Sequence, residues 1–240
     1  MLTLYPIVYS FYLMFTDMNL TGVGKFIGLE NLKYAFTDDP LFIKAFINTL
    51  KYVVMFVPSS IILAFFVALL LSKKVKGLGF FRTAFYIPYI TSGVAVTILW
   101  GWIYQKDYGI INYVLSLFGI KGVNWLGDKN IAMISIVILS LWTIGNNIII
   151  MLAGIQDIPQ SYYESAQIDG AGAIRQIFSI TLPLCTPTIY FNLIVTIIAA
   201  FQVFQQPLIL TNGGPLNSTY TAAIHMYNNG FLYGKWDMHP

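Results

Sequence analysis

The sequence predicts an all-α fold, a polytopic transmembrane helical bundle, and three observations support that prediction. Hydrophobic residues make up 57% of the 240 residues and charged residues only 10%, whereas soluble domains carry about 25% charged residues. The apolar residues lie in long uncharged stretches, and a helix needs about 20 such residues to cross a bilayer. A short basic loop between two of the stretches indicates how the bundle is oriented.

Four stretches are long enough to predict complete membrane-spanning helices. They cover residues 49–71, 83–104, 131–152 and 187–210. Residues 2–16 are also apolar but too short to cross about 30 Å of hydrocarbon at 1.5 Å per residue. A signal peptide would need a charged segment before this stretch and a small-residue cleavage site after it, and neither is present. We therefore interpret residues 2–16 as part of a first span.

The whole chain, residues 1–240, is predicted to be one transmembrane domain, because no internal repeat or low-complexity linker divides it. The segment after the fourth complete span stays polar to residue 240 and contains no further apolar stretch. We therefore expect a chain truncated at both ends, with a partial first span and with the last span absent.

The loop at residues 72–82 sets the expected orientation. It contains four basic residues and no acid, namely Lys73, Lys74, Lys76 and Arg82. Short loops rich in Lys and Arg stay in the cytoplasm, so residues 153–186 are also inside, and we call them the inner loop. The outer segments are then residues 17–48, residues 106–130 and the residues after 210. Within the second of these we expect a short interfacial helix at residues 110–120.

Several classes of function lack their characteristic residues. Cys185 is the one cysteine, which excludes an intrachain disulfide and a thiolate metal cluster. The two histidines, His225 and His239, show no metal-ligand spacing, and neither a nucleophile turn nor a P-loop occurs. The net charge of +3 is small and gives no support to nucleic-acid binding. We predict no catalytic residue, no metal site, no cofactor bound by this chain and no nucleic-acid partner.

The inner loop is long for a turn and is patterned as two helices. Pro159 precedes the first helix, Ser161 can cap it, and Glu164 falls three residues later, as in a capping box. This first helix is expected to end near Ile168.

Two glycines, Gly170 and Gly172, follow the first helix and permit a sharp or left-handed turn. Residues 173–180 then predict a second short helix. The inner loop is therefore expected to be a helix-turn-helix that projects from the membrane into the cytoplasm.

The same residues carry a family resemblance. Glu164-Ser165-Ala166, Gly170 nearby, and Ile180-Thr181-Leu182-Pro183 at their spacing resemble the cytoplasmic "EAA" loop of binding-protein-dependent ABC importer permeases. Ser165 departs from the pattern, because the family usually has alanine there. The resemblance implies a coupling loop that docks in a cleft of the ATP-hydrolysing subunit. The residues that it assigns to this coupling are Glu164, Ser165, Ala166, Asp169, Gly170 and Ala171. Two alternatives remain, since Glu164 can simply cap its helix and Gly170 can simply end it.

Other segments resemble the carbohydrate branch of this family. The clearest is Leu210-Thr211-Asn212-Gly213-Gly214-Pro215, with Thr219 and Thr221 downstream, which is similar to the outer loop of the maltose-type, larger-partner subunit. The resemblance implies a multi-pass permease in the cell membrane that translocates a sugar or polyol. The implied partners are an ATPase subunit that binds ATP and Mg, a second permease subunit in a heterodimer, an extracytoplasmic solute-binding protein and the lipid bilayer.

Polar and aromatic side chains in the third and fourth spans are the candidates for a substrate pathway. They are Trp142, Asn146, Asn147, Asn192, Gln202 and Gln206. By helical spacing, the last three share one face. The competing interpretation is that these amides join neighbouring helices by hydrogen bonds. The stretch from Tyr52 to Leu71 and the other three apolar stretches lack acidic and basic residues, which disfavours the alternative function, a secondary ion-coupled transporter.

Overall fold

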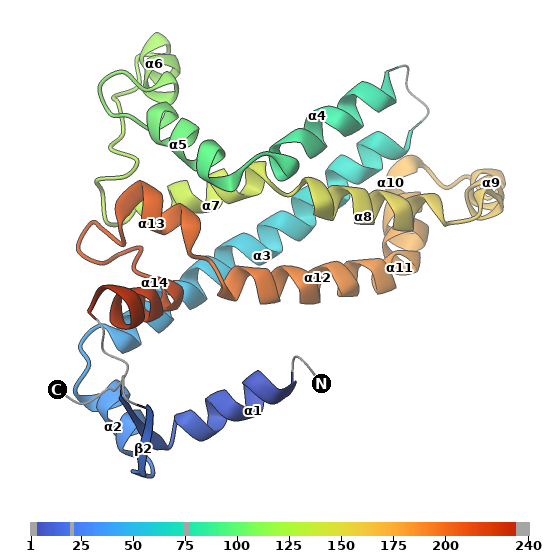
Figure 1. Cartoon of the computed structure of the whole chain (residues 1–240). Coiled ribbons are helices and arrows are strands. Elements are labelled where there is room, and N and C mark those ends of the chain that lie inside the picture. Colours follow the sequence, from blue (N-terminus) through green and yellow to red (C-terminus); the bar gives the residue numbers. More distant parts are fainter. Residues whose placement is uncertain (1–3, 20–21, 74–76, 234–240) are drawn as a thin grey trace.

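In the computed structural model the described residues are 4–19, 22–73 and 77–233. One long helix, α3 (Phe42–Ser72), crosses the molecule, and several other helices of the bundle pack against it (Figure 1). Its 31 residues correspond to a length of about 46 Å. Most of its buried side chains recur at intervals of three or four residues, and they are Ala45, Asn48, Thr49, Tyr52, Val57, Ser60, Ala64, Phe65, Ala68 and Leu71.

Three further apolar segments are bent pairs of helices. They are α4 (Leu78–Ile90) with α5 (Gly93–Ile103), bent by 98°, α7 (Ala132–Trp142) with α8 (Gly145–Gln156), bent by 52°, and residues 173–184 with α12 (Thr186–Phe201), bent by 66°. Among the described residues, α3 alone is long and apolar enough to span a membrane as one helix. Up to four spans are present if each bent pair counts as one, by length and composition.

The bends differ from the sequence prediction, which treated residues 83–104 and residues 131–152 each as one span. Hydropathy measures composition and is insensitive to direction, so a bend inside an apolar stretch leaves no trace in it. Between α4 and α5, Thr91 and Ser92 have ψ values of 148° and 120°, which are extended and end the helical hydrogen-bonding pattern.

The fourth predicted span, residues 187–210, is also divided. The helix α12 ends at Phe201, and α13 (Gln205–Thr211) begins after a short break. At the break, Phe204 has φ −136° and ψ −55°, which is not helical. The prediction that Asn192, Gln202 and Gln206 share one helical face is therefore wrong, because they do not lie on one continuous helix.

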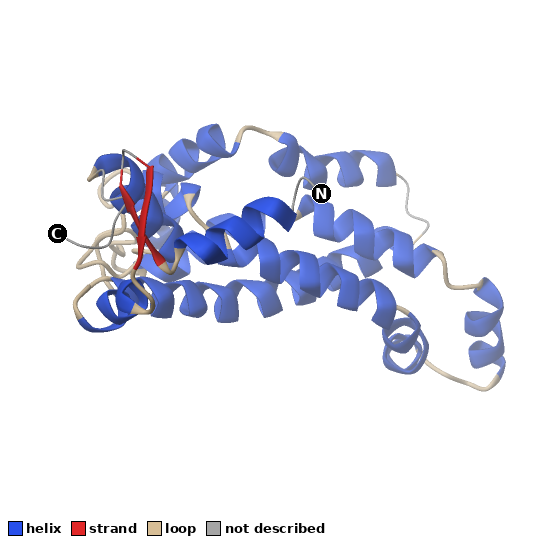
Figure 2. Cartoon of the chain, turned by 60° about the horizontal axis from the view of Figure 1, so that its bottom comes forward, coloured by secondary structure: helices blue, strands red, loops and turns tan. Residues whose placement is uncertain are grey.

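The N-terminal region contains structure that the all-α prediction did not include. The helix α1 (Leu4–Leu13) covers most of the predicted partial span at residues 2–16 and is followed by an antiparallel hairpin (Figure 2). The strands are β1 (Thr16–Asn19) and β2 (Gly22–Phe26), and α2 (Glu30–Thr37) comes next. The Asn31 Nδ2 atom donates to the carbonyls of Met14 and Thr16, at 3.1 Å each, and so ties α2 to the hairpin. The polar end at residues 234–240, from which the missing last span was inferred, lies outside the described residues.

The predicted short helix at residues 110–120 is present as α6 (Ile110–Leu117). Asn112 fixes it to the following segment, since its Nδ2 atom donates to the carbonyls of Lys106 and Val123. Its Oδ1 atom accepts hydrogen bonds from the Val123 backbone and from Trp125 Nε1. The last described elements are α14 (Ala222–Tyr227) and a π-helical turn, η2 (Asn228–Leu232).

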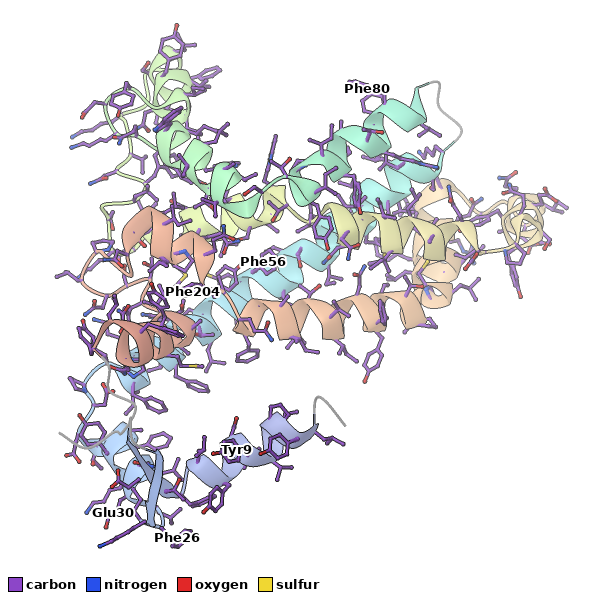
Figure 3. The ribbon with its side chains drawn as sticks, in the orientation of Figure 1. Tyr9, Phe26, Glu30, Phe56, Phe80 and Phe204 are labelled. Atoms are coloured by element: carbon purple, nitrogen blue, oxygen red, sulfur yellow. The ribbon has the colours of Figure 1, made fainter. Side chains whose placement is uncertain are left out.

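Large apolar side chains cover much of the outer surface. Phe80 on α4 and Phe26 on β2 are 74% and 73% exposed, and both point away from the helices (Figure 3). The side chains of α1 from Leu4 to Tyr12 are exposed too. Contiguous apolar surface of this extent is typical of contact with lipid or with another subunit.

Buried polar side chains join the helices internally. The Tyr52 hydroxyl donates to Ser140 Oγ at 2.9 Å, linking α3 to α7, and the Tyr104 hydroxyl donates to the Ser135 carbonyl at 2.8 Å. Because the bilayer core supplies no water to polar groups, each such pair removes a cost that an isolated group would carry.

The Tyr52–Ser140 contact gives a first prediction. Tyr52→Phe removes the hydroxyl donor and should lower the free energy of unfolding by about 0.5–1 kcal/mol, as measured by denaturant titration in detergent micelles. Tyr190→Phe is the control, because Tyr190 is 63% exposed. A double-mutant cycle with Ser140→Ala should show a coupling energy of the same size. Equal losses in the Tyr52 and Tyr190 variants would contradict the assignment.

Candidate functional site

The inner loop forms one end of the molecule, beyond the ends of α8 and α12 (Figure 1). It contains α9 (Gln160–Ile168), α10 (Ala173–Gln176), a π-helical turn η1 (Ile177–Thr181) and α11 (Leu182–Leu184). The expected second helix at residues 173–180 is thus a short α-helix that continues into a wider turn. Figure 2 shows α9 projecting away from the body of the bundle.

The N-terminus of α9 differs from the predicted capping box. The N-cap is Pro159, and no side chain caps the helix by a hydrogen bond. Pro159 already holds its φ at −59°, a value that suits the start of a helix, which places Ser161 inside the first turn. The alternative role of Glu164 as part of a cap is therefore wrong. The Glu164 side chain is exposed and is available to a partner.

The C-terminus of α9 is a Schellman motif built on Gly170. The Ala171 N–H donates to the Ala166 carbonyl at 2.8 Å, and the Gly170 N–H donates to the Gln167 carbonyl at 3.0 Å. Gly170 has a φ of +75°, so the predicted left-handed turn is confirmed. Gly172 has φ −67° and ψ 167°, which any residue adopts.

Glycine is required at position 170 because of the backbone conformation, and not because a side chain would clash with a neighbour. A Cβ atom built on it meets nothing within 4 Å, while its positive φ strains any residue with a side chain. Ala166 supplies the carbonyl that closes the motif. The spacing between Ala166 and Gly170 thus has a structural meaning that is independent of any partner.

Two side-chain contacts brace the corner between α9 and the second helix. The Gln176 Nε2 atom donates to the Ala171 carbonyl at 2.8 Å, and the hydroxyls of Tyr163 and Thr181 lie 2.9 Å apart. Thr181 is 2% exposed. The two helices are therefore held at a fixed angle.

The braced corner carries a surface that is unusually apolar for a loop. The exposed fractions are 87% for Ile168, 73% for Ile174, 61% for Phe178 and 52% for Tyr162. The carboxylates of Glu164 and Asp169 and the guanidinium of Arg175 are exposed on the same segment. An apolar centre with charged groups around it is the usual composition of a protein–protein interface.

Two of the six pathway candidates, Asn147 and Asn192, lie in contact and join α8 to α12 inside the bundle. The Asn147 Nδ2 atom on α8 donates to Thr196 Oγ1 on α12 at 2.8 Å, and Asn192 Nδ2 on α12 donates to the Asn147 carbonyl at 3.0 Å. These amides join helices, as the competing interpretation expected. Asn192 is fully buried, and its Oδ1 atom has no hydrogen-bond partner within the described residues.

The other four candidates do not form one cluster. Trp142 is 57% exposed and lies edge-on to Trp100, with ring centroids 5.9 Å apart. Asn146 and Gln206 are half-buried and Gln202 is exposed. Among the described residues, no group of three or more His, Cys, Asp or Glu side chains is placed to hold a metal ion.

The segment around Gly213 and Gly214 is a compact turn held by buried threonines. Thr219 Oγ1 lies 2.6 Å from Thr211 Oγ1 and donates to the Gly214 carbonyl, and Thr221 Oγ1 donates to the Val203 carbonyl at 3.0 Å. Gly213 has a φ of +80°, and a Cβ atom there would lie 2.6 Å from the Tyr220 ring. The spacing of these threonines thus serves the turn itself.

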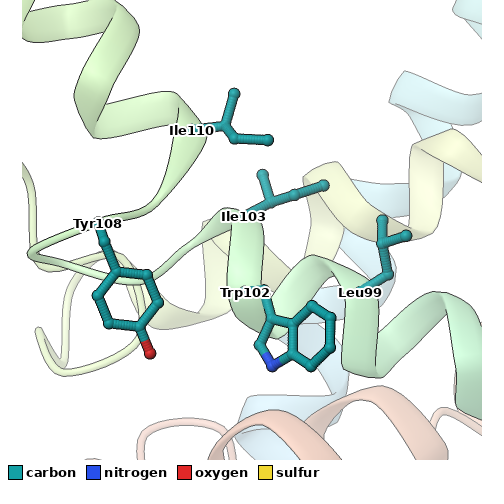
Figure 4. A pocket seen from close by; sticks show the side chains of 5 residues that line it. All are labelled: Leu99, Trp102, Ile103, Tyr108 and Ile110. Atoms are coloured by element: carbon teal, nitrogen blue, oxygen red, sulfur yellow. The ribbon is translucent and has the colours of Figure 1, made fainter.

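Two of the pockets on the described surface lie at the end away from the inner loop. One, of about 490 Å³, lies where α5 leads into α6 and is lined by Leu99, Trp102, Ile103, Tyr108 and Ile110 (Figure 4). The other, of about 610 Å³, includes three lysines, Lys44, Lys51 and Lys129. The second pocket was not predicted from the sequence. Its one local signal was the seven-residue spacing of Lys44 and Lys51, which places both on one helical face.

Comparisons with known proteins agree with the arrangement. A family model described as "Binding-protein-dependent transport system inner membrane component" matches residues 40–236. The chain is 38% identical to the probable ABC transporter permease protein YesP of Bacillus subtilis (strain 168), covering 96% of this chain and 76% of that protein. It is 33% identical to the arabinooligosaccharides transport system permease protein AraP of the same organism, covering 97% and 74%.

Solved structures are similar as well. The crystal structure of a bacterial alginate ABC transporter, in complex with an alginate pentasaccharide-bound periplasmic protein, contains a chain that matches this one with a TM-score of 0.75. The sequence identity is 27%, and the match covers 88% of this chain and 75% of that chain. The helical bundle is therefore that of an ABC transporter permease.

The Schellman motif gives a second prediction. Gly170→Ala should cost about 1–2 kcal/mol because of the positive φ, and amide hydrogen exchange at residues 170 and 171 should become about tenfold faster or more. Gly170→Asn should have a smaller effect, because asparagine tolerates this conformation. Gly172→Ala is the matched control and should leave exchange unchanged. Similar effects in both alanine variants would contradict the conformational argument.

Proposed function

Because the chain belongs to the family of binding-protein-dependent transport system inner membrane components, we propose that it is the permease subunit of an ATP-driven ABC importer for a sugar or polyol. The observation that carries the proposal is the inner loop, whose Gly170 corner presents an apolar surface at one end of the bundle. The names of AraP and of the alginate transporter support a carbohydrate as the substrate class.

The apolar surface of the inner loop is the proposed docking site for the ATPase subunit. Ile168 and Ile174 make few contacts within this chain, and burying them against a partner removes apolar area from water. Glu164 and Asp169 would lie at the rim of the contact, with Ser165, Ala166, Gly170 and Ala171 setting its shape. ATP and Mg belong to the partner subunit in this proposal, and this chain hydrolyses nothing.

The helices α8 and α12, which lead into and out of the inner loop, provide a route from the docking site to the bundle. Asn147 and Thr196 join α8 to α12 by a direct hydrogen bond, so a displacement of α9 moves both helices together. Closure of two ATPase subunits would pull on the loop and switch the bundle from inward-facing to outward-facing. A second permease subunit and an extracytoplasmic binding protein complete the proposed assembly, with the chain crossing the cell membrane several times.

The substrate pathway remains a proposal, with Trp142, Asn146, Asn147, Asn192, Gln202 and Gln206 as candidates. Asn147 and Asn192 already use their Nδ2 atoms between helices, which favours an indirect role for them. Trp142 is the one aromatic residue among the six; it is 57% exposed and suits stacking on a sugar ring. The ion-coupled alternative has less support, because the family to which the chain belongs depends on binding proteins.

The docking proposal gives a third prediction. In proteoliposomes that contain the full transporter, Ile168→Ser should reduce ATP hydrolysis stimulated by sugar-loaded binding protein about fivefold or more, because truncating a central interface residue costs more than about 1 kcal/mol. Ile168 is 87% exposed in this chain, so the variant should fold normally.

Ile110→Ser is the control for this experiment. Ile110 is 64% exposed and lies on α6, at the opposite end of the molecule. It should retain full stimulation. Unchanged activity of the Ile168 variant, or an equal loss in the Ile110 variant, would reject the inner loop as the docking site.

A further inference from the structure

The pocket of about 610 Å³ lies at the end of the bundle that faces away from the inner loop. The first turns of α3, the residues that lead into α7, and the turn after Pro215 line it. We call it the lysine pocket. In the proposed orientation it opens on the side from which a binding protein delivers substrate.

The lysine pocket is strongly basic. Lys44, Lys51 and Lys129 all line it, and none of its lining residues is acidic. Among the described residues, none of these three lysines forms an ion pair with a carboxylate within 4 Å. Asp128 precedes Lys129, but its Oδ1 atom accepts a hydrogen bond from the Asn130 backbone at 2.8 Å. Three positive charges around one concavity therefore have no ion-pair partner within 4 Å in the described chain.

Neutral polar groups add to the lining. Asn48, Asn130 and Ser218 contribute to the pocket wall. The Ser218 Oγ atom is buried and has no hydrogen-bond partner in the described part of the chain. A buried hydroxyl without a partner costs free energy that a bound acceptor would recover. A ligand oxygen with negative charge would satisfy both the hydroxyl and the lysines.

The turn on one side of the pocket is held in a strained conformation by α3. Leu216 and Asn217 have φ values of +50° and +56°. This conformation costs about 1–2 kcal/mol for leucine, whereas asparagine tolerates it. Lys44 Nζ donates to the Leu216 carbonyl at 2.7 Å, and Asn48 Nδ2 donates to the Asn217 carbonyl at 2.8 Å. Two of the lining side chains thus fix the shape of the pocket wall, and strain of this kind concentrates at functional sites.

The size and shape of the pocket select among anionic ligands. A concave volume of about 610 Å³ is in the range of small-molecule sites, roughly 300–1,000 Å³, whereas a docked protein would need a broad surface. We propose that the lysine pocket binds the carboxylate, phosphate or sulfonate group of an acidic carbohydrate as it enters the transporter. The role of this pocket in import rests on the proposed function, whereas its ability to bind an anion does not.

The test measures binding directly and needs no ATP hydrolysis. The full-length protein, assembled with its partner subunits in nanodiscs of phosphatidylcholine and free of nucleotide, is titrated with D-glucuronate and with D-glucose. Glucuronate should bind, glucose should bind at least tenfold more weakly, and inorganic phosphate should compete with glucuronate. Raising the salt concentration should weaken glucuronate binding several-fold, because salt screens charges.

Variants identify the site. Lys51→Gln and Lys129→Gln should each weaken glucuronate binding about three- to tenfold, and Lys51→Arg should retain it. Lys33→Gln is the matched control, because Lys33 is an exposed lysine on α2, at the same end of the molecule but outside the pocket. Lys44 is left unchanged, since its bond to Leu216 supports the fold.

Three results would overturn the proposal. The first is equal binding of glucose and glucuronate, and the second is an unchanged affinity in the Lys51 and Lys129 variants. The third is loss of glucuronate binding when the nanodiscs contain phosphatidylglycerol, which would assign the anion site to lipid headgroups. Stimulated ATP hydrolysis, measured in parallel, separates this outcome from failure of the proposed import function.

Discussion

Asn192 donates a hydrogen bond to the backbone of Asn147, and Asn147 donates one to Thr196, so that α8 and α12, the helices that lead into and out of the inner loop, are joined inside the bundle. Coupling of the inner loop to the bundle depends on this contact. The corner at Gly170 fixes the angle between α9 and the helix that follows, but the angle matters to the bundle only if α8 and α12 move as one body. In an apolar environment an unpaired amide is costly, so the contact resists separation of α8 from α12.

The two ends of the molecule use the same physical device for different purposes. At the inner end, the backbone of Gly170 takes a left-handed conformation without strain, because glycine has no side chain. The helix α9 ends there in backbone hydrogen bonds between its own last residues and the turn. At the outer end, Leu216 takes that conformation with strain, and Lys44 on α3 holds it there by donating a hydrogen bond to its carbonyl. Glycine gives a corner that forms by itself, whereas Leu216 gives one that persists only while the surrounding structure supports it.

Local chemistry decided which features the sequence could predict. The turn at Gly170, the short helix near Ile110 and the apolar stretches follow from residue type and spacing within a few positions. The bends between α4 and α5 and between α12 and α13 escaped prediction, because hydropathy contains no information about direction. The predicted capping box is absent because the helix begins directly after Pro159, which places Ser161 inside its first turn. The lysine pocket was not foreseeable, since Lys129 and Lys51 come together only through the packing of α7 on α3.

The contrast between α3 and the bent helices has a mechanical consequence. Breaking a backbone hydrogen bond inside a bilayer costs several kcal/mol, so a change of shape is cheapest where the helical pattern is already interrupted. The bends of 98°, 52° and 66° provide three such places. The helix α3 lacks one backbone hydrogen bond at Pro58 but runs on as a single helix. The long helix α3 thus serves as a continuous support for three bent helix pairs, and two of these pairs, the one that contains α8 and the one that contains α12, connect directly to the inner loop.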